Sequence, residues 1–179
     1  MRTICVLAAM VLTALTACDS KVYDTYHHTP LAGWEKNDTL YYDVPRIMRA
    51  GTYELTLGVR TNNAFPFMAI TLIVDQTLLP SRQTVSDTLD CQLVKPGGTY
   101  KEGGINYYEY TTHVRSLSLA PQDSLHITVR HDMKRDILPG VSDVGVALSY
   151  DSHHPTPVMG RCHSLLRSPK TRKAATRTL

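Results

Sequence analysis

Long hydrophobic runs are absent from this 179-residue chain beyond its first residues, and so is sustained helical periodicity. The one extended apolar run, Ile4 to Leu15, is about half the length that a helix needs to cross a bilayer. Phenylalanine and tryptophan are scarce, with two copies and one, whereas tyrosine occurs 10 times. A tyrosine-rich composition favours half-buried β-strands. These absences argue against a helical bundle and against a helical membrane protein.

Motifs that carry enzyme chemistry are missing as well. The chain contains no Gly-x-Ser-x-Gly elbow, no phosphate-cradling glycine loop and no His-Glu-x-x-His. Neighbouring residues of an extended chain point in opposite directions, so neither adjacent histidine pair, 27–28 or 153–154, forms a chelate. Asp87 and Asp90 are expected on opposite strand faces. The sequence therefore predicts no catalytic residue, no cofactor and no metal site, and it favours a protein that is not an enzyme.

Acidic residues are absent after Asp151. Residues 18–151 hold 12 Lys and Arg against 16 Asp and Glu, whereas residues 152–179 hold six Lys and Arg and no acid. A mildly acidic domain gives no reason to expect nucleic-acid binding. Low hydrophobicity and high charge predict a disordered basic tail over 152–179. That tail is expected to be solvated, and contact with anionic lipid head groups is the alternative.

Cysteine is rare, and the most informative copy is Cys18 at the end of Leu15-Thr16-Ala17-Cys18. An apolar residue, two small residues and a cysteine behind Arg2 and a short apolar run form a lipobox, which predicts a lipoprotein signal peptide over 1–17. Cys18 is then the lipid-attachment residue, and an ordinary secretory signal is the alternative. A disulfide between Cys91 and Cys162 is conceivable in an oxidising compartment, but a buried Cys91 is expected instead.

Period-two alternation dominates the remaining chain. Residues 18–37 are polar and rich in turn formers, so they are expected to form a lipidated tether that docks through Trp34. Strands are predicted at 52–60, 67–74, 84–94, 105–119, 124–130 and 143–150, with the long 105–119 segment bent or divided in two. Residues 131–139 are the one place for a short helical turn. About seven strands predict an all-β antiparallel sandwich over 38–151, immunoglobulin-like or jelly-roll-like.

Several stretches in a fixed order resemble one known family. They are Cys18-Asp19-Ser20-Lys21-Val22-Tyr23-Asp24, Gly33-Trp34, Val59-Arg60-Thr61-Asn62-Asn63 with Phe65-Pro66-Phe67, Leu72-Ile73-Val74, Asp87-Thr88-Leu89, Gly97-Gly98 and Gly140-Val141-Ser142-Asp143-Val144-Gly145. Together they are similar to the gliding-motility lipoprotein H (GldH-type) family over about residues 1–150. The resemblance implies an envelope lipoprotein, most simply of the outer membrane, linked to gliding motility and its associated protein-secretion apparatus. It implies no catalytic residues, and only the lipid-bearing cysteine carries over, to Cys18.

Two kinds of function remain in competition. The first is an accessory lipoprotein that binds other envelope proteins of a motility and secretion machine, since an open sandwich leaves edge strands able to pair with a partner. The second is a lipoprotein that binds glycans or peptidoglycan fragments against Trp34, Tyr107, Tyr108 and Tyr110, although alternation places Tyr107 on the opposite face from the other two tyrosines of that strand. Which partner, which leaflet and which role for the tail are questions that the sequence leaves open.

Overall fold

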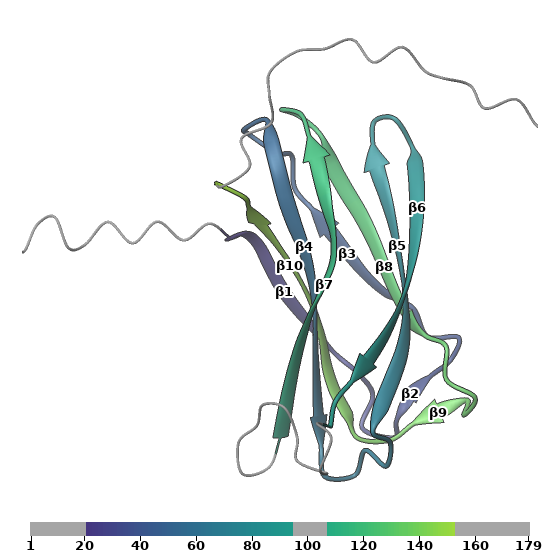
Figure 1. Cartoon of the computed structure of the whole chain (residues 1–179). Helices are drawn as coiled ribbons and strands as arrows, with labels where there is room; N and C mark the ends of the chain where they lie inside the picture. The colour runs from purple at the N-terminus through teal and green to yellow at the C-terminus, as the bar shows by residue number, and fades with distance from the viewer. Residues whose placement is uncertain (1–20, 95–106, 153–179) are drawn as a thin grey trace, which may run out of the picture.

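The computed structural model describes residues 21–94 and 107–152, and every regular element within these two ranges is a β-strand. Figure 1 shows two facing layers of long strands, with a short ribbon at the lower end. In spatial order, the first sheet contains β1 (Lys21–His28), β10 (Val141–Tyr150), β4 (Gly51–Asn62) and β7 (Tyr107–Leu119). The second contains β3 (Leu40–Val44), β8 (Ser124–His131), β5 (Ala69–Leu79) and β6 (Gln83–Gln92). Strands β2 (Trp34–Glu35) and β9 (Ile137–Leu138) form the ribbon.

The strand order identifies the type of sandwich. All paired strands are antiparallel. The two-residue strands β2 and β9 are left aside, and the other eight are numbered 1 to 8 along the chain. Their spatial order is then 1-8-3-6 in the first sheet and 2-7-4-5 in the second. This is the order of a jelly roll, in which the chain repeatedly crosses between two four-stranded sheets. The predicted all-β antiparallel sandwich is confirmed, and the jelly-roll alternative is the one observed.

Alternation along each strand builds the core. In β4, Tyr53, Leu55, Leu57 and Val59 are buried, and the residues between them are mostly half-buried on the other face. Strands β8 and β10 bury Leu125, Ile127, Val129, Val144, Val146 and Leu148 in the same way. Each fully buried aliphatic side chain contributes about 1.5–3 kcal/mol to folding. The period-two pattern of the sequence therefore corresponds directly to the layer between the sheets.

Two large aromatic residues of the core have their polar atoms satisfied. Trp34 is 0% exposed, and its Nε1 donates to the carbonyl oxygen of Asp38 at 2.8 Å. The Tyr42 hydroxyl crosses from β3 to the opposite sheet and donates to the carbonyl oxygen of Val144 at 2.7 Å. A buried polar group without a partner costs about 1–3 kcal/mol, so these bonds allow the two rings to be buried completely.

The long strand β7 is continuous but irregular. Arg115 lies opposite Leu55, whereas His113 lies opposite Thr56, so Val114 is an extra residue and forms a β-bulge. A bulge bends its strand and increases the local twist. The bend predicted for residues 105–119 is thus present as a bulge within one strand.

A polar bridge closes one side of the sandwich, where the edge strands β6 and β7 face each other. The Asp87 carboxylate lies on the inward face of β6 and binds Arg115 of β7 at 2.9 and 3.0 Å. It also accepts from the Nε2 of buried Gln76 at 3.0 Å. Of the two contacts with Arg115, the one from Nη2 is a hydrogen bond, and a hydrogen bond between two charged groups is stronger than one between neutral groups. Asp87 therefore ties the two sheets together where apolar contact is sparse.

Several local predictions differ from the structure. The polar stretch expected to be a tether, 18–37, forms β1 from Lys21 and then β2, because β1 pairs along its length with β10. Residues 131–139 contain β9 and no helical turn. In the predicted strand 84–94, the burial expected for Cys91 is confirmed and Leu89 and Leu93 also reach the core, but Val85 is exposed on the edge strand β6. Outside the described residues lie Cys18, Cys162 and nearly all of the predicted tail.

The elongated sandwich has two distinct ends. We call the end where β1 begins and β10 ends the proximal end; it carries the loops at 45–50, 80–82 and 120–123 (Figure 1). The distal end is where β1 ends and β10 begins, and it carries the loops at 29–33, 63–68 and 132–136. Both described termini of the sandwich thus belong to the proximal end.

A tight loop after β4 shapes the distal end. Asn62 accepts a hydrogen bond from the amide N–H of Ala64 through its side-chain oxygen at 2.9 Å, which forms an Asx-type turn. Phe65 is buried and meets Phe67 edge to face at 5.5 Å, so this pair packs at the end of the core. Gly140 lies against this loop with φ +79, and its carbonyl oxygen accepts from the Asn62 N–H at 2.8 Å. The loop and the start of β10 are therefore in direct backbone contact.

Candidate functional site

The outer face of the first sheet carries a tyrosine lying across two glycines. Tyr26 of β1, Gly145 of β10 and Gly58 of β4 form one cross-strand row. A Cβ atom at Gly145 would lie 2.5 Å from the Tyr26 ring, and one at Gly58 would lie 2.3 Å from its hydroxyl oxygen. Only glycine at both positions lets the ring lie flat on the sheet. The two glycines thus position the Tyr26 hydroxyl above β4.

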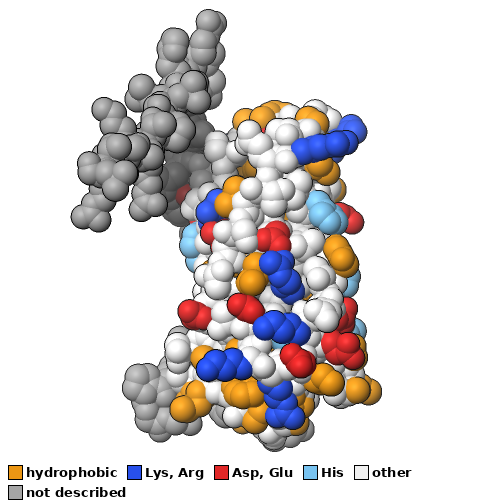
Figure 2. Space-filling model, turned by 90° about the vertical axis from the view of Figure 1, so that its right-hand side faces the viewer, with side chains coloured by type: hydrophobic (Ala, Val, Ile, Leu, Met, Phe, Trp, Pro, Cys, Tyr) orange, Lys and Arg blue, Asp and Glu red, His pale blue; other side chains and the backbone are white. Residues whose placement is uncertain are grey.

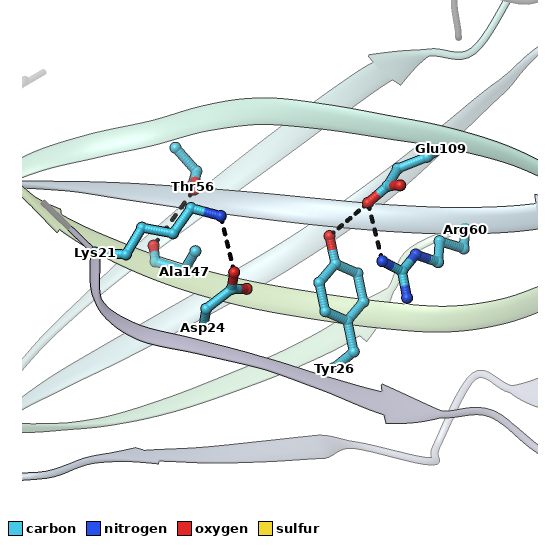
Figure 3. Close-up of polar contacts among 7 residues, drawn as sticks. All are labelled: Lys21, Asp24, Tyr26, Thr56, Arg60, Glu109 and Ala147. Carbon is cyan, nitrogen blue, oxygen red and sulfur yellow. Dashed lines mark hydrogen bonds and ion pairs between the residues drawn. The ribbon is translucent and has the colours of Figure 1, made fainter. Parts of the chain in front are cut away.

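A charged pair holds the Tyr26 ring from above, as Figure 3 shows. The Tyr26 hydroxyl donates to Glu109 Oε1 at 2.9 Å, and Arg60 Nη2 lies 3.3 Å from the same oxygen. The Arg60 guanidinium also stacks on the ring, 4.0 Å from its centroid. We call Tyr26, Arg60 and Glu109 the outer-face cluster. Its members come from β1, β4 and β7, so the folded sheet is required to assemble it.

Two surface hollows adjoin the outer-face cluster toward the distal end. One is lined by Arg60, Tyr107, Ser142 and Asp143. The other is lined by His28, Thr29, Leu31, Asn62, Gly140, Val141 and Ser142. Ser142 lines both, and Asp143 forms an ion pair with His28 across the β1–β10 edge. The hollows and the cluster together offer an exposed aromatic ring, a guanidinium, carboxylates and a hydroxyl on one surface.

The electrostatics of the cluster favour binding over proton transfer. Burial, followed by the hydrogen bond to Glu109, raises the pKa of Tyr26 to about 12. Burial acts to lower the pKa of Arg60, but the Glu109 carboxylate outweighs it and the pKa is raised. Both groups therefore keep their protons near neutral pH, and neither is a general base. The Arg60 and Glu109 side chains, which are 36% and 33% exposed, remain able to contact a polar ligand.

The raised pKa makes a prediction about alkaline stability. Tyr26 is expected to stabilise the fold fully below pH 10.0, and that contribution is lost as the pH rises through about 12, because the unfolded state releases its proton first. We therefore expect Tyr26→Phe to flatten the decline in stability over this window, measured by chemical denaturation at a series of pH values. Tyr41→Phe, on an exposed tyrosine of the other sheet, is the matched control. Identical pH dependence of wild type and Tyr26→Phe would contradict the assignment.

The aromatic residues expected to form a glycan platform do not come together. Trp34 is buried in the core with its indole N–H engaged by the backbone, so it is excluded from any exposed platform. Tyr107 is 52% exposed, whereas Tyr108 and Tyr110 are half-buried and Tyr110 packs against the core. Of the four residues proposed from the sequence, Tyr107 is the one that lines either of the two hollows described above.

Histidines and acids of the described strands are paired on the sheet surfaces. His113 lies 2.9 Å from Glu54, and His126 lies 2.6 Å from Asp43. Asp90 accepts from Thr71 at 2.7 Å on the outer face of the second sheet, away from inward-facing Asp87. Among residues 21–94 and 107–152, no three His, Cys, Asp or Glu side chains converge as metal ligands would. Within the same ranges, no helix is long and apolar enough to span a membrane.

The comparison with known families identifies what the sandwich is. A sequence model described as GldH lipoprotein matches residues 21–148, which run from the first residue of β1 almost to the end of β10. The chain belongs to the GldH lipoprotein family. The resemblance inferred from the ordered motifs is thereby confirmed, and in this GldH-family chain the match includes every member of the outer-face cluster.

Individual relatives agree with the family match. The chain is 31% identical over 150 residues to "Gliding motility lipoprotein GldH" of Flavobacterium johnsoniae, covering 79% of this chain and 91% of the relative. It is 29% identical over 86 residues to "Gliding motility lipoprotein GldH homolog" of Christiangramia forsetii, covering 48% of this chain and 51% of the relative. The full-length comparison therefore rests on the first relative.

Solved structures add only weak similarity. A GH115 4-O-methyl-α-glucuronidase, BtGH115A, matches with a TM-score of 0.45 and 12% identity over 76% of this chain and 18% of the enzyme. Eiger TNF from S. frugiperda matches with a TM-score of 0.32 and 11% identity over 78% of this chain and 99% of that one. At these scores, neither similarity carries an argument about the GldH-family chain.

Proposed function

We propose that the chain is a lipid-anchored, non-enzymatic protein of the cell envelope that serves as an accessory component of a gliding-motility and protein-secretion machinery. The observation that carries the proposal is the family match across the whole sandwich, together with a relative named for gliding motility that the chain covers almost completely. The anchor would be lipid on Cys18, and the outer membrane is the location that we propose. The protein then acts by binding neighbours while held at a membrane.

The distal end and the outer-face cluster supply the contact surface in this proposal. Leu31, Met68, Tyr107 and Ile137 are exposed hydrophobic residues at or beside the distal end. Arginine and aromatic residues are enriched at the centres of protein interfaces, and Arg60 and Tyr107 line one hollow there. Because the proximal end leads to the anchor, the distal end points away from the site of attachment. A partner held in the envelope would meet this end first.

Capture from detergent-solubilised envelopes tests the proposal. Tagged wild-type protein is expected to retain defined envelope proteins in the presence of a chelator, and a strain lacking the gene is expected to lose spreading or secretion. Tyr107→Ala should reduce capture, because it removes the exposed ring of the hollow. Tyr41→Ala is the control, since Tyr41 is 59% exposed on the opposite sheet. A protein that runs alone, in a deletion strain with normal motility and secretion, would refute the proposal.

Glycan binding remains the second candidate because one observation favours it. The hollow that contains Tyr107 also contains Arg60, Ser142 and Asp143, so an aromatic face lies near hydrogen-bonding side chains. Such a combination suits a sugar ring or a peptidoglycan fragment. A glycan array with the purified domain separates the candidates: binding that Tyr107→Ala abolishes would support this function, and an array without signal would exclude it.

A further inference from the structure

A hollow at the proximal end is lined by two arginines from loops far apart in the sequence. Arg46 follows β3, and Arg82 lies in the hairpin between β5 and β6. Leu79, Pro80 and Pro121 supply apolar walls, and Gln122 joins Arg46 through a hydrogen bond of 3.4 Å. Neither arginine forms an ion pair among those found in the described ranges. Asp123 and Ser124 complete the lining, so two cations and one carboxylate share an open hollow with apolar walls.

The loops that form this hollow are joined by backbone hydrogen bonds. The Ile47 N–H donates to the carbonyl oxygen of Asp123 at 2.7 Å, and the Gln122 N–H donates to the carbonyl oxygen of Ile47 at 2.8 Å. Ile47 is itself buried in the core. Arg46 is therefore held next to the 120–123 turn by its neighbour, so the hollow is a formed feature of the fold.

Cationic and hydrophobic side chains are mixed across the same end. Met48 is 83% exposed and Leu79 is 37% exposed, and Arg49 is exposed beside Met48. Figure 2 shows Lys or Arg side chains next to hydrophobic ones at the top of the molecule. Of the nearby acids, Asp123 accepts the Ala120 N–H at 2.8 Å, which occupies one carboxylate oxygen with the backbone. This mixture matches the boundary between lipid head groups and acyl chains.

The position of the chain ends places this surface beside the anchor. Lys21, the first residue of β1, lies opposite Ser149 near the end of β10. Cys18 precedes Lys21 by three residues, which span at most about 10 Å. The sequence after Asp151 supplies six more Lys and Arg and no acid, and it leaves the sandwich from the neighbouring strand. The anchor, the arginine hollow and the basic tail therefore start from the same end.

We propose that the proximal end is a membrane-docking surface that binds anionic phospholipids, with Arg46 and Arg82 receiving a lipid phosphate and Met48 and Leu79 resting at the acyl boundary. This inference rests on the lipid anchor of the proposed function, because the anchor brings this end to a bilayer. The membrane then orients the sandwich, and the distal end is held away from the lipid.

Vesicle sedimentation of a protein that begins at residue 19 tests the docking surface without the lipid. Removing residues 1–18 leaves the core intact, since every core residue lies between Trp34 and Leu148 or packs against that set. We expect binding to phosphatidylcholine vesicles that contain phosphatidylglycerol, and weak or no binding to phosphatidylcholine alone. Each cation near the surface contributes about fivefold, so R46E with R82E should weaken binding by about 25-fold or more. High salt should weaken it too.

The matched control reverses two exposed cations at the distal end, Lys134 and Arg135, which gives the same change in net charge. K134E with R135E should bind as the wild type does, and thermal melts should show both double variants folded. An equal loss of vesicle binding in both double variants would overturn the proposal, because the effect would then come from net charge alone. Unchanged vesicle binding by R46E with R82E would overturn it too. Inorganic phosphate that weakens binding no more than sodium chloride of equal ionic strength supports a lipid surface, whereas full competition by phosphate at an ionic strength where sodium chloride leaves binding in place overturns it. Acyl labelling of Cys18 in cells tests the anchor, whereas vesicle binding of the protein without residues 1–18 tests the docking surface. A failure of one is therefore distinguishable from a failure of the other.

Discussion

Gly140→Ala is expected to destabilise the sandwich by about 3 kcal/mol or more, because two penalties act at once. The residue has φ +79, which a side chain rarely tolerates. A Cβ atom there would lie 2.2 Å from the Phe65 amide nitrogen and 2.6 Å from the Ala64 carbonyl carbon. Both are backbone atoms of the loop that packs Phe65 into the core, so relief requires the loop to move. A thermal melt should show Tm lowered by about 10 °C.

Gly51→Ala is the matched control for this prediction. Its Cβ atom would also be close to a neighbour, at 2.4 Å, but the neighbour is the ring of Tyr150, a side chain that is able to shift. Its backbone does not have a positive φ. We expect a clearly smaller loss of stability than for Gly140→Ala. Equal Tm values for the two variants would show that the contact between Gly140 and the 62–65 loop does not govern stability.

Cys18→Ala is expected to abolish acylation, which is an all-or-none effect. The lipobox predicts that the thiol of Cys18 carries the diacylglyceryl group, and alanine offers no atom for the bond. A high-salt wash should then release the domain from the membrane fraction, because the apolar run at 4–15 is too short to span a bilayer and attachment through surface charges is weakened by salt. Incorporation of labelled palmitate and the mass of the mature amino terminus provide the measurements.

Cys5→Ala serves as the control for the anchor, since Cys5 lies within the predicted signal peptide and should be removed with it. That variant should be labelled and membrane-bound like the wild type. Continued labelling of Cys18→Ala, or an unmodified amino terminus on the wild-type protein, would contradict the lipoprotein assignment for this chain.

The sequence predicts the long strands that bury one complete face, but it misses the five-residue strand β3. In β4, β8 and β10 the alternation of apolar and polar residues is nearly perfect, and each was located within a few residues. Strand β1 escaped prediction because none of its side chains is fully buried and a register shift between Lys21 and Tyr23 breaks its period. An edge strand gains much of its stability from backbone pairing with its neighbour, which leaves little signature in the side chains. The polar stretch was therefore interpreted as a tether.

The candidate site was harder to predict than the fold. Glu109 is 83 residues away from Tyr26 and 49 residues away from Arg60 in the sequence. Only the pairing of the strands in the first sheet brings these three side chains together. A partial signal was present, because Gly58 and Gly145 lie inside two strands, and glycine inside a strand often marks close approach of another group. The sequence does not show that the approaching group is the Tyr26 ring. The pairing of β1 with β10 places that ring over the two glycines.

The inward carboxylate of Asp87 has a consequence for molecules crowded on a membrane. Anchored copies diffuse in two dimensions, where their edges meet far more often than in solution, and the β6 edge would otherwise invite strand pairing between neighbours. Asp87 is engaged with Arg115 and Gln76 across the gap between the sheets. A charge turned inward on an edge strand disfavours the addition of another strand, because that charge would have to be covered. The same bridge that closes the sandwich thus helps to keep a densely anchored population from polymerising edge to edge.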